Sequence, residues 1–342
     1  VFLQLGSKYS VNAKLVENAA ILEGITITSE GASIFGKGRT GSETNVGSEA
    51  LTKLPTISRS AQDFYRATPA SDGVSFAGRN DQYNNFTIDG AIFNNPFGLD
   101  AATPGGQADA QPISLDAIEQ ITVSLAPYDV TQAGFTGASV NAVTKSGTNK
   151  FKGAVFGYTR NQDLTGGKIS GEKLVVPDLS QNQYGFALGG PIVKNKLFFF
   201  VNAEVDKRTD LGSTAIAAAP GRTGSNVSRV AKTDLDAVAN ALKTRFQYDP
   251  GVYEDYLHNT NSTKAILKLD YQISKNHTLT ATYNFLDAFK QKPAHPSAIG
   301  RRGPDLTTLQ FFNSGYQINN KINSGIIELR SIFGNTAANK LQ

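Results

Sequence analysis

The sequence contains no cysteine, methionine or tryptophan. The lack of cysteine excludes a disulfide framework, a thiolate metal site and a cysteine nucleophile. It also fits a protein of the cell envelope, where exposed thiols would oxidise. Residue 1 is Val1, within an apolar run rather than an initiating methionine. We therefore expect the chain to be an internal piece of a longer protein, already separated from any signal peptide.

Charge and long apolar runs are also scarce. Charged residues make up 18% of the chain, the net charge is +4, and lysines and arginines are scattered rather than clustered. This pattern argues against a nucleic-acid-binding protein. The longest apolar run, 197–201, is far shorter than the roughly 18–20 residues of a membrane-spanning helix. A soluble protein and a β-barrel membrane protein both remain compatible with these absences.

Strict alternation of polar and apolar residues is the main pattern after residue 150. In 264–274, Lys264 and Lys268 fall on one face of an expected strand, and Leu267 and Leu269 fall on the other. The predicted strands cover 150–161, 182–192, 196–207, 263–274, 277–288, 307–318 and 322–333. Short turns at 194–195, 275–276 and 319–320 alternate with long connections at 162–181, 208–262 and 289–306.

This alternation of short turns and long loops is typical of outer-membrane barrels. A soluble β-sandwich also alternates, with shorter strands and more even loops. We therefore predict a mostly β protein. Its second part is an incomplete antiparallel transmembrane β-barrel that supplies about seven of the ~22 strands needed around a plugged lumen. The longest loop carries a predicted helix near 233–246 with Thr233 as its expected cap, and this helix either packs on its own loop or forms a lid or partner contact.

The region 31–150 has mixed α/β character. It contains a short capped helix near 58–66, a strand that enters a turn at 85–90, and strands near 120–124 and 139–144. Ser114 is predicted to cap a single helical turn. Gly36, Gly38 and Gly41 have dinucleotide-fingerprint spacing, but no apolar helix pattern follows them, so we interpret them as loop glycines.

Several of these segments together resemble TonB-dependent outer-membrane receptors, of the Oar-like branch common in Bacteroidetes. The plug-like motifs are 54–60, 75–80, 85–90, 112–121 and 137–149, the last containing the run TKSGTN. Residues 189–192 and 194–200 are similar to the first barrel strands of that branch. The resemblance implies a plug domain over 31–150 and the N-terminal barrel strands over 151–342. It also implies that 1–17 are the end of a carboxypeptidase-regulatory-like β-sandwich.

The resemblance also implies a TonB-box-like segment within 18–30, a periplasmic strand that the energy-transducing protein TonB would bind by strand addition. Its residues are Leu22, Glu23, Gly24, Ile25, Thr26, Ile27 and Thr28. An ordinary structural strand or linker is the alternative interpretation, because short β-prone runs are common.

By analogy with the family, outward plug loops would contact an extracellular ligand. The candidate tips are Arg79, Asn80, Asp81, Gln82, Tyr83, Asn94, Asn95 and Phe97. The alternative for each is an ordinary loop residue bonded to the wall or to solvent. Asp89 and Gly90 are interpreted as structural turn residues, and Arg59, Arg79, Glu119 and Lys145 as plug residues that pair with the lumen wall.

An enzyme is not expected. The three histidines, His258, His277 and His295, lack metal-ligand spacing, and neither an HExxH nor a GxSxG motif occurs. No cofactor is predicted; the Asp- and Asn-rich loops offer oxygen ligands of the kind Ca²⁺ prefers, without an EF-hand pattern.

The expected function is TonB-dependent import of an unidentified extracellular ligand through the bacterial outer membrane. Expected partners are TonB, outer-membrane lipids, the ligand and other outer-membrane proteins. Two alternatives stay open: a receptor-like barrel that acts as a surface scaffold without active transport, and, more distantly, a secreted β-rich adhesin.

Overall fold

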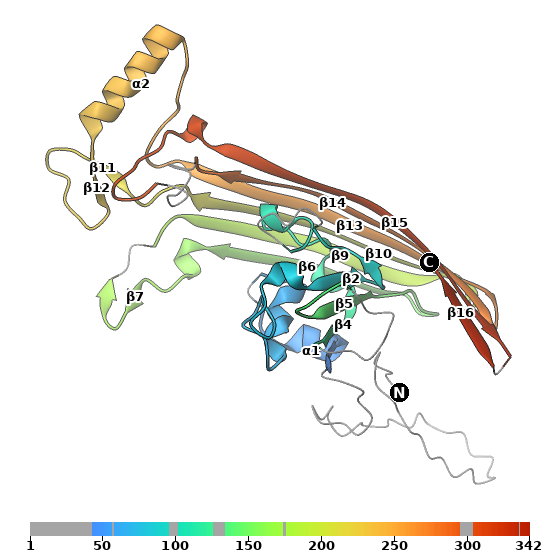
Figure 1. The fold of residues 1–342 in the computed structure, drawn as a ribbon. Helices are drawn as coiled ribbons and strands as arrows, with labels where there is room; N and C mark the ends of the chain where they lie inside the picture. The colour runs from blue at the N-terminus through green and yellow to red at the C-terminus, as the bar shows by residue number, and fades with distance from the viewer. Residues whose placement is uncertain are drawn as a thin grey trace. The chain divides into compact units, whose positions relative to one another are not determined.

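The computed structural model describes residues 43–56, 58–95, 102–125, 134–173, 176–294, 304–334 and 336–342. The described chain divides into two compact units (Figure 1). The first unit contains residues up to 104 together with 114–145, and the second contains 105–113 together with 146–342. The predicted sandwich end (1–17) and TonB-box-like segment (18–30) lie outside the described residues.

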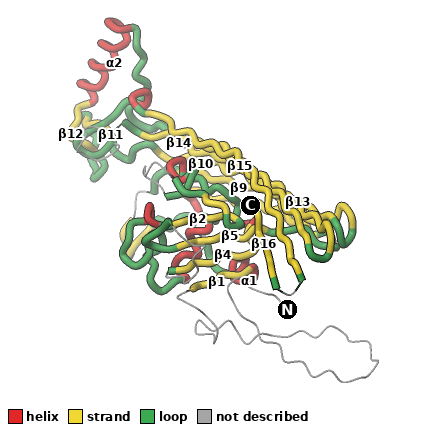
Figure 2. Tube along the Cα trace, turned by 45° about the vertical axis from the view of Figure 1, so that its right-hand side comes forward, coloured by secondary structure: helices red, strands yellow, loops and turns green. Residues whose placement is uncertain are grey.

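The first unit is built on a five-stranded sheet in the order β1-β4-β5-β2-β3 (Figure 2). Its strands are β1 (Glu43–Gly47), β2 (Asn85–Ile88), β3 (Ala91–Ile92), β4 (Ile118–Ser124) and β5 (Ser139–Thr144). β2 and β5 run parallel, and the other neighbouring pairs are antiparallel. The predicted mixed α/β character of this region is therefore confirmed.

Short helices accompany this sheet: α1 (Ser48–Lys53) and 3-10 helices at Ala61–Ala67, Asp81–Tyr83 and Leu115–Ala117. Ser60 and Asp63 form a capping box at the start of the 3-10 helix Ala61–Ala67. The Ser114 side chain accepts from the Asp116 N–H, as predicted. Phe64, Phe76, Ile88, Ile121 and Val140 are buried and form much of the apolar core.

The second unit is dominated by a seven-stranded sheet in the order β16-β15-β14-β13-β10-β9-β6. Its strands are β6 (Lys152–Asn161), β9 (Leu179–Val193), β10 (Leu197–Leu211), β13 (Leu257–Ser274), β14 (His277–Lys292), β15 (Tyr316–Phe333) and β16 (Ala337–Leu341). All neighbouring pairs are antiparallel. The long strands lie side by side in Figure 1 and form an open sheet, with β6 and β16 at its edges.

One part of the strand prediction is wrong. The sequence predicts strands 307–318 and 322–333 with a turn at 319–320, but β15 runs unbroken through this point. Asn319 pairs with Phe289, and Asn320 pairs with Ala288. The neighbouring strand supplies backbone partners along the whole length, which overrides the turn preference of two asparagines. The last strand, β16, was not predicted.

The two faces of the sheet differ in polarity because side chains alternate along each strand. One face, here called the polar face, carries buried or half-buried polar groups such as Asn202, Glu204, Lys264, Thr282 and Asn284. The opposite face, the apolar face, exposes large hydrophobic side chains, including Tyr184, Phe186, Leu188, Leu267, Tyr283 and Ile327. A sheet that exposes hydrophobic side chains on this scale needs an apolar environment on that face.

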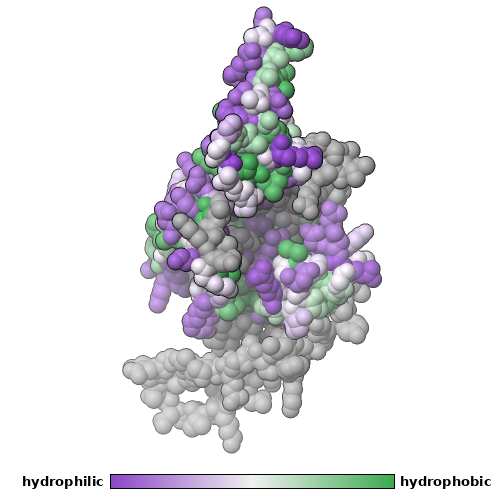
Figure 3. Space-filling view, turned by 90° about the vertical axis from the view of Figure 1, so that its left-hand side faces the viewer, coloured by the Kyte–Doolittle hydropathy of each residue, from purple (hydrophilic) through white to green (hydrophobic). Residues whose placement is uncertain are grey.

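The longest connection folds into a small structure of its own, here called the loop module (212–256 with 304–314). It contains the parallel pair β11 (Ile216–Ala218) and β12 (Val227–Ala231), followed by α2 (Lys232–Phe246). The predicted helix is therefore present, although Ala231 occupies the N-cap and Thr233 lies inside the helix. α2 projects beyond the strand ends (Figure 1). Its surface is mostly hydrophilic, with hydrophobic side chains between the polar ones (Figure 3).

The remaining connections include a 3-10 helix at Gln162–Leu164, the two-residue strands β7 (Lys168–Ile169) and β8 (Glu172–Lys173), and a 3-10 helix at Phe312–Ser314. None of the helices among the described residues has the length and apolar character needed to cross a membrane.

Candidate functional site

The polar face of the large sheet contains a buried ion pair. Lys264 Nζ lies 2.9 Å from Glu204 Oε1, and the two side chains are only 7% and 0% exposed. Gln183 donates a second hydrogen bond to the same carboxylate, at 2.8 Å. The three residues come from β13, β10 and β9, so one cluster ties three neighbouring strands together. Buried charges are tolerated when they are paired and hydrogen-bonded in this way.

The segment 105–113 packs on the polar face of β14 and β15. It begins at Gly105, which has φ +90°, and continues into a 3-10 helix at Gly106–Ala108. A Cβ atom on Gly105 would lie 2.7 Å from Leu286 Cδ2 and 2.9 Å from the Ala110 carbonyl oxygen. Only glycine combines this backbone conformation with so close an approach to the strand.

Hydrophobic packing, hydrogen bonds and an ion pair hold this segment. Ala108 and Ala110 pack with Leu286, Ala288 and Ile322 in one hydrophobic cluster. The remaining contacts are polar: the Ala108 N–H donates to Asn320 Oδ1 at 3.1 Å, Asn284 Nδ2 donates to the Pro112 carbonyl at 3.0 Å, and Lys290 forms an ion pair with Asp109. The segment thus covers an apolar patch on the polar face, and hydrogen bonds and an ion pair surround that patch.

These docking residues were missed by sequence reasoning, although a signal was present. The polar side of β14 reads Thr278, Thr280, Thr282 and Asn284, and then changes to Leu286 and Ala288. Two apolar residues on the polar side of an amphipathic strand mark a place where something other than solvent is packed. Asn320 was missed because its segment was interpreted as a turn.

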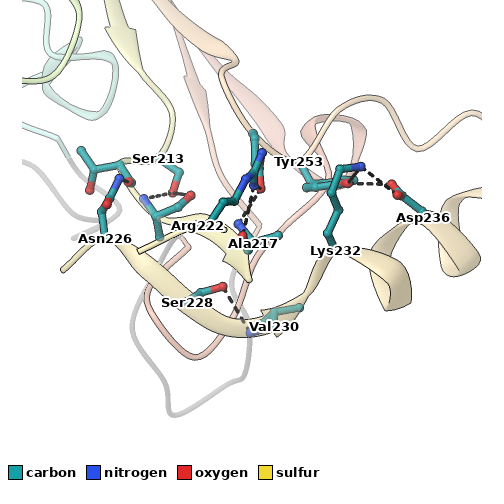
Figure 4. A network of polar contacts seen from close by, with 12 residues as sticks. Ser213, Ala217, Arg222, Asn226, Ser228, Val230, Lys232, Asp236 and Tyr253 are labelled. Atoms are coloured by element: carbon teal, nitrogen blue, oxygen red, sulfur yellow. Dashed lines mark hydrogen bonds and ion pairs between the residues drawn. The ribbon is translucent and has the colours of Figure 1, made fainter. Parts of the chain in front are cut away.

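The loop module is held by two polar networks (Figure 4). In the first, Glu254 accepts hydrogen bonds from the buried Ala217 N–H and from Arg222 Nη1, the latter at 2.9 Å. In the second, Tyr253 Oη donates to Asp236 Oδ1 at 2.6 Å, and Lys232 Nζ lies 2.8 Å from Asp236 Oδ2. Both networks border an apolar cluster that includes Ala217, Leu235, Tyr253, Leu309 and Phe311.

Charge pairing shifts the pKa values in these networks. The hydrogen bond to Glu254 raises the pKa of Arg222 above its usual value. The hydrogen bond from Lys232, followed by that from Tyr253, lowers the pKa of Asp236. Partial burial, followed by the bond to Asp236, raises the pKa of Tyr253. All three groups therefore keep their ordinary neutral-pH charge states, and the networks act as structural clamps.

We expect Glu254→Ala to loosen the loop module. The substitution leaves the buried Ala217 N–H without its acceptor, which costs about 1–3 kcal/mol. Hydrogen exchange in 212–256 should accelerate while the strands stay protected. Thr233→Ala is the control: Thr233 does not cap α2, so no change is expected, whereas a true cap would cost about 1 kcal/mol. Unchanged exchange in the Glu254 variant would contradict this role for its carboxylate.

The predicted plug-tip residues fall into two groups. Arg79, Asn80, Gln82 and Tyr83 are exposed around a 3-10 helix at Asp81–Tyr83, where Asn80 Oδ1 accepts from the Gln82 N–H at 2.9 Å. Asp81 is half-buried. This group remains a candidate contact surface, and Tyr83 is its most prominent aromatic side chain, at 58% exposure.

The second group is bonded within the fold. Asn94 accepts from the Phe86 N–H at 2.7 Å and donates to Asn85 Oδ1 at 2.9 Å, which braces the β2–β3 hairpin. The Asn95 N–H donates to the Ala102 carbonyl. Phe97 lies outside the described residues.

The predicted structural residues of the first unit occupy defined positions. Asp89 has φ +51°, and its carboxylate accepts from the Thr144 N–H at 2.9 Å and from the Thr144 hydroxyl at 2.6 Å. Gly90 has φ +87° in the same turn. Glu119 is exposed on β4, and the Lys145 N–H donates to the Ala117 carbonyl. Arg59 forms an ion pair with Asp116 of the same unit. Pairing of these charges with a lumen wall stays a prediction.

No group of three or more His, Cys, Asp or Glu side chains that could hold a metal ion occurs in the described ranges. His258 is buried on β13 and stacks on Phe312 at 5.9 Å, while His277 lies beside Ser331 at 2.9 Å. His295 lies outside the described residues.

Comparison with known proteins gives three kinds of similarity. The family model described as outer membrane beta barrel domain matches residues 143–342. A TonB-dependent transporter, Oar, from Myxococcus xanthus is 30% identical over 220 residues, which is 62% of this chain and 19% of that protein.

Solved structures share the fold. The outer membrane transporter YddB from Escherichia coli superposes with a TM-score of 0.57 at 13% identity, over 85% of this chain and 37% of that chain. A mutant of the ferric enterobactin receptor PfeA from Pseudomonas aeruginosa superposes with a TM-score of 0.54 at 14% identity, over 86% of this chain and 39% of that chain. The chain thus spans about a fifth of its curated relative and less than half of these structures.

Proposed function

Because the chain belongs to the outer membrane beta barrel domain family and resides in the outer membrane, we propose that it forms part of a TonB-dependent transporter. In this proposal the seven-stranded sheet is one section of the barrel wall, with its apolar face in lipid and its polar face toward the lumen. The first unit is the plug, and the loop module is extracellular. The likeness to the Myxococcus transporter and to the folds of two transport-related proteins supports this assignment.

One observation carries the proposal: the docking of 105–113 on the polar face of β14 and β15. A porin-like wall would face an aqueous channel along its whole length. Here an apolar patch lies on the lumen side, and a segment from within the plug-like region covers it. This arrangement is suited to a wall that holds an internal domain.

The transport cycle follows from that arrangement as part of the proposal. A ligand would bind from outside against the exposed residues Arg79, Asn80, Gln82 and Tyr83, together with the loop module. TonB would bind 22–28 by strand addition and pull on the first unit. In this proposal the segment 105–113 stays attached to β14 and β15 through its ion pair and hydrogen bonds. The rest of the plug can then move relative to the wall when TonB pulls.

The test uses the full-length protein and TonB. A peptide that covers 18–30 should bind the C-terminal domain of TonB, and deletion of 22–28 should abolish energised uptake while surface binding of the ligand is retained. A deletion of equal length in the Gly-rich stretch 34–40 is the control and should leave uptake intact. The native ligand can be identified first, as a molecule that co-purifies with the protein.

A surface scaffold without active transport is the second candidate, favoured by the structured loop module and its projecting helix α2. It predicts wild-type ligand binding and no TonB affinity. Absence of TonB binding, together with normal uptake after deletion of 22–28, would contradict TonB-dependent transport. Ligand binding without TonB affinity and without energised uptake in the intact protein would favour the scaffold.

A further inference from the structure

A cluster of three aromatic side chains connects the loop module to the end of β13. The His258 ring stacks on Phe312, with 5.9 Å between the ring centroids and 28° between the ring planes. Tyr256 contacts both rings edge-on, at 5.3 Å from His258 and 5.6 Å from Phe312. His258 belongs to β13, whereas Tyr256 and Phe312 belong to the loop module. The cluster therefore attaches the module to the large sheet.

The cluster is closely packed. The exposed fractions of Tyr256 and His258 are only 6% and 9%. A Cβ atom on Gly212 would lie 2.1 Å from Tyr256 Cε2 and 3.0 Å from His258 Cδ2, so the backbone passes directly against both rings. The Gly212 N–H also donates to the Tyr256 carbonyl at 2.8 Å. Water therefore has little access to the His258 ring.

The chain around Phe312 also holds the segment that follows α2. The Phe312 N–H donates to the Val252 carbonyl at 2.7 Å, and Asn313 Nδ2 donates to the Asp249 carbonyl at 2.9 Å. These bonds join two stretches of the loop module that lie far apart in sequence. Both stretches therefore lose a contact with the sheet when Phe312 separates from His258.

His258 differs from the other two rings because it can become charged. Tyr256 and Phe312 are uncharged at neutral and mildly acidic pH. Neither Nδ1 nor Nε2 of His258 has a hydrogen-bond partner among the residues that the structure describes. A neutral imidazole can pack as an aromatic ring in such a place, but an imidazolium needs acceptors or water for both of its N–H groups. Protonation of His258 is therefore linked to opening of the cluster.

His258 lies on the part of β13 that precedes the hydrophobic stretch of its apolar face. The outward side chains after His258 are Asn259, Asn261 and Thr263, and apolar ones begin at Ala265. The imidazole is thus outside the part of the strand that would lie in lipid. It belongs to the same end of the sheet as the loop module and is reached by the pH of the surrounding water when the cluster opens.

The charged groups around His258 compensate only in part for an imidazolium. Asp210 lies opposite on β10, but its carboxylate is already paired with Arg208 at 2.8 Å. The other charged groups on the adjoining elements are Lys292, at the end of β14, and Asp249, which is 68% exposed. Burial lowers the pKa of His258, and the Asp210 carboxylate opposes this shift.

We propose that His258 is a pH-sensitive latch, which holds the loop module against the sheet while it is neutral and releases the module when it is protonated. In the open state the hydrated ring has the ordinary imidazole pKa of about 6.5. Because the closed state binds the proton less readily, it is fully favoured above about pH 7 and is progressively lost as the pH falls below about 6.5. The proposal concerns the loop module and is independent of transport.

Hydrogen exchange of the full-length protein in detergent micelles, corrected for the intrinsic pH dependence of exchange, tests the latch between pH 7.5 and pH 5. The readout is the protection of 248–253 and 308–314. His258→Phe keeps an aromatic ring that cannot be protonated. His277→Phe is the matched control, because His277 lies at the opposite strand end, beside Ser331 and Phe333.

In the wild type and in His277→Phe, protection of the two stretches should fall several-fold between pH 7.5 and pH 5. The upper limit is about 30-fold, for a group that titrates at 6.5 only in the open state. Protection in His258→Phe should stay constant, and β13 and β14 should remain protected throughout. Constant protection in the wild type would overturn the proposal. An equal fall in His258→Phe would also overturn it and would assign the response to carboxylates of the module, such as Asp249 or Glu254.

A second variant tests the contact itself. Phe312→Ala removes the ring on which His258 stacks, so protection of 248–253 should already be low at pH 7.5 and should fall no further at pH 5. A pH response of wild-type size in Phe312→Ala would show that protonation acts on the module by a route other than this stacking contact, and would contradict the latch.

Discussion

Replacing Lys264 by alanine is expected to lower the free energy of unfolding of the full-length protein by up to about 3–5 kcal/mol, because the fully buried Glu204 carboxylate loses the ammonium group that pairs with it. The two charged atoms lie 2.9 Å apart, and the Glu204 side chain has no solvent exposure. Gln183 still donates one hydrogen bond to the carboxylate, but a neutral amide does not replace the lost cation. The change is measured by denaturant titration, in which the folded fraction is determined from the different gel mobilities of the folded and unfolded barrel.

An exposed ion pair on the neighbouring strands provides the matched control. Lys321 and Asp287 are 68% and 47% exposed and lie 3.3 Å apart. Lys321→Ala should therefore cost no more than about 1 kcal/mol. Adding Glu204→Gln to Lys264→Ala should recover part of the loss, since it removes the buried negative charge that has lost the Lys264 cation. Equal effects of Lys264→Ala and Lys321→Ala would show that the Glu204–Lys264 pair is solvated and contributes little.

Gly105→Ala is expected to weaken the docking of 105–113 by about 2–4 kcal/mol, through backbone strain at φ +90° and overpacking against Leu286. Hydrogen exchange of 105–113, and protease cleavage within it, should increase while β14 and β15 remain protected. If the segment serves as the fixed point of the plug, ligand uptake should fall as well.

Gly221 separates strain from crowding. It has φ +81°, close to that of Gly105, but a Cβ atom added to Gly221 would meet nothing within 4 Å. Gly221→Ala therefore carries only the conformational cost, about 1 kcal/mol or somewhat more. If both alanine variants behave alike, the contact with Leu286 is not what makes Gly105 necessary.

The strand pattern of the second unit could be predicted because it is local. Alternation in 263–274 and 277–288 assigns each residue to a face without knowledge of any partner, and both strands are present with the expected turn at 275–276. The same holds for the capping box at Ser60 and for the helix α2. These features depend on side-chain periodicity and on hydrogen bonds between near neighbours in the chain.

The errors arose where the decisive contacts are distant in sequence. Asn319 and Asn320 read as a turn, yet β14 pairs with both, and Asn320 then accepts a hydrogen bond from Ala108. Asn94 was predicted as a candidate ligand-facing tip; its side chain braces a hairpin, and its contact with a ligand stays a prediction. In both cases a polar side chain forms hydrogen bonds whose partners cannot be predicted from the neighbouring sequence.

The sequence by itself determined that this protein is mostly β, with amphipathic strands joined by short turns and long loops. Those properties follow from the alternation of side chains along an extended backbone, which is fixed by covalent geometry. Tertiary structure alone decided that Lys264 neutralises Glu204 and that 105–113 covers an apolar patch on the polar face. Each of these depends on strand register, which is set by backbone pairing between segments far apart in the chain.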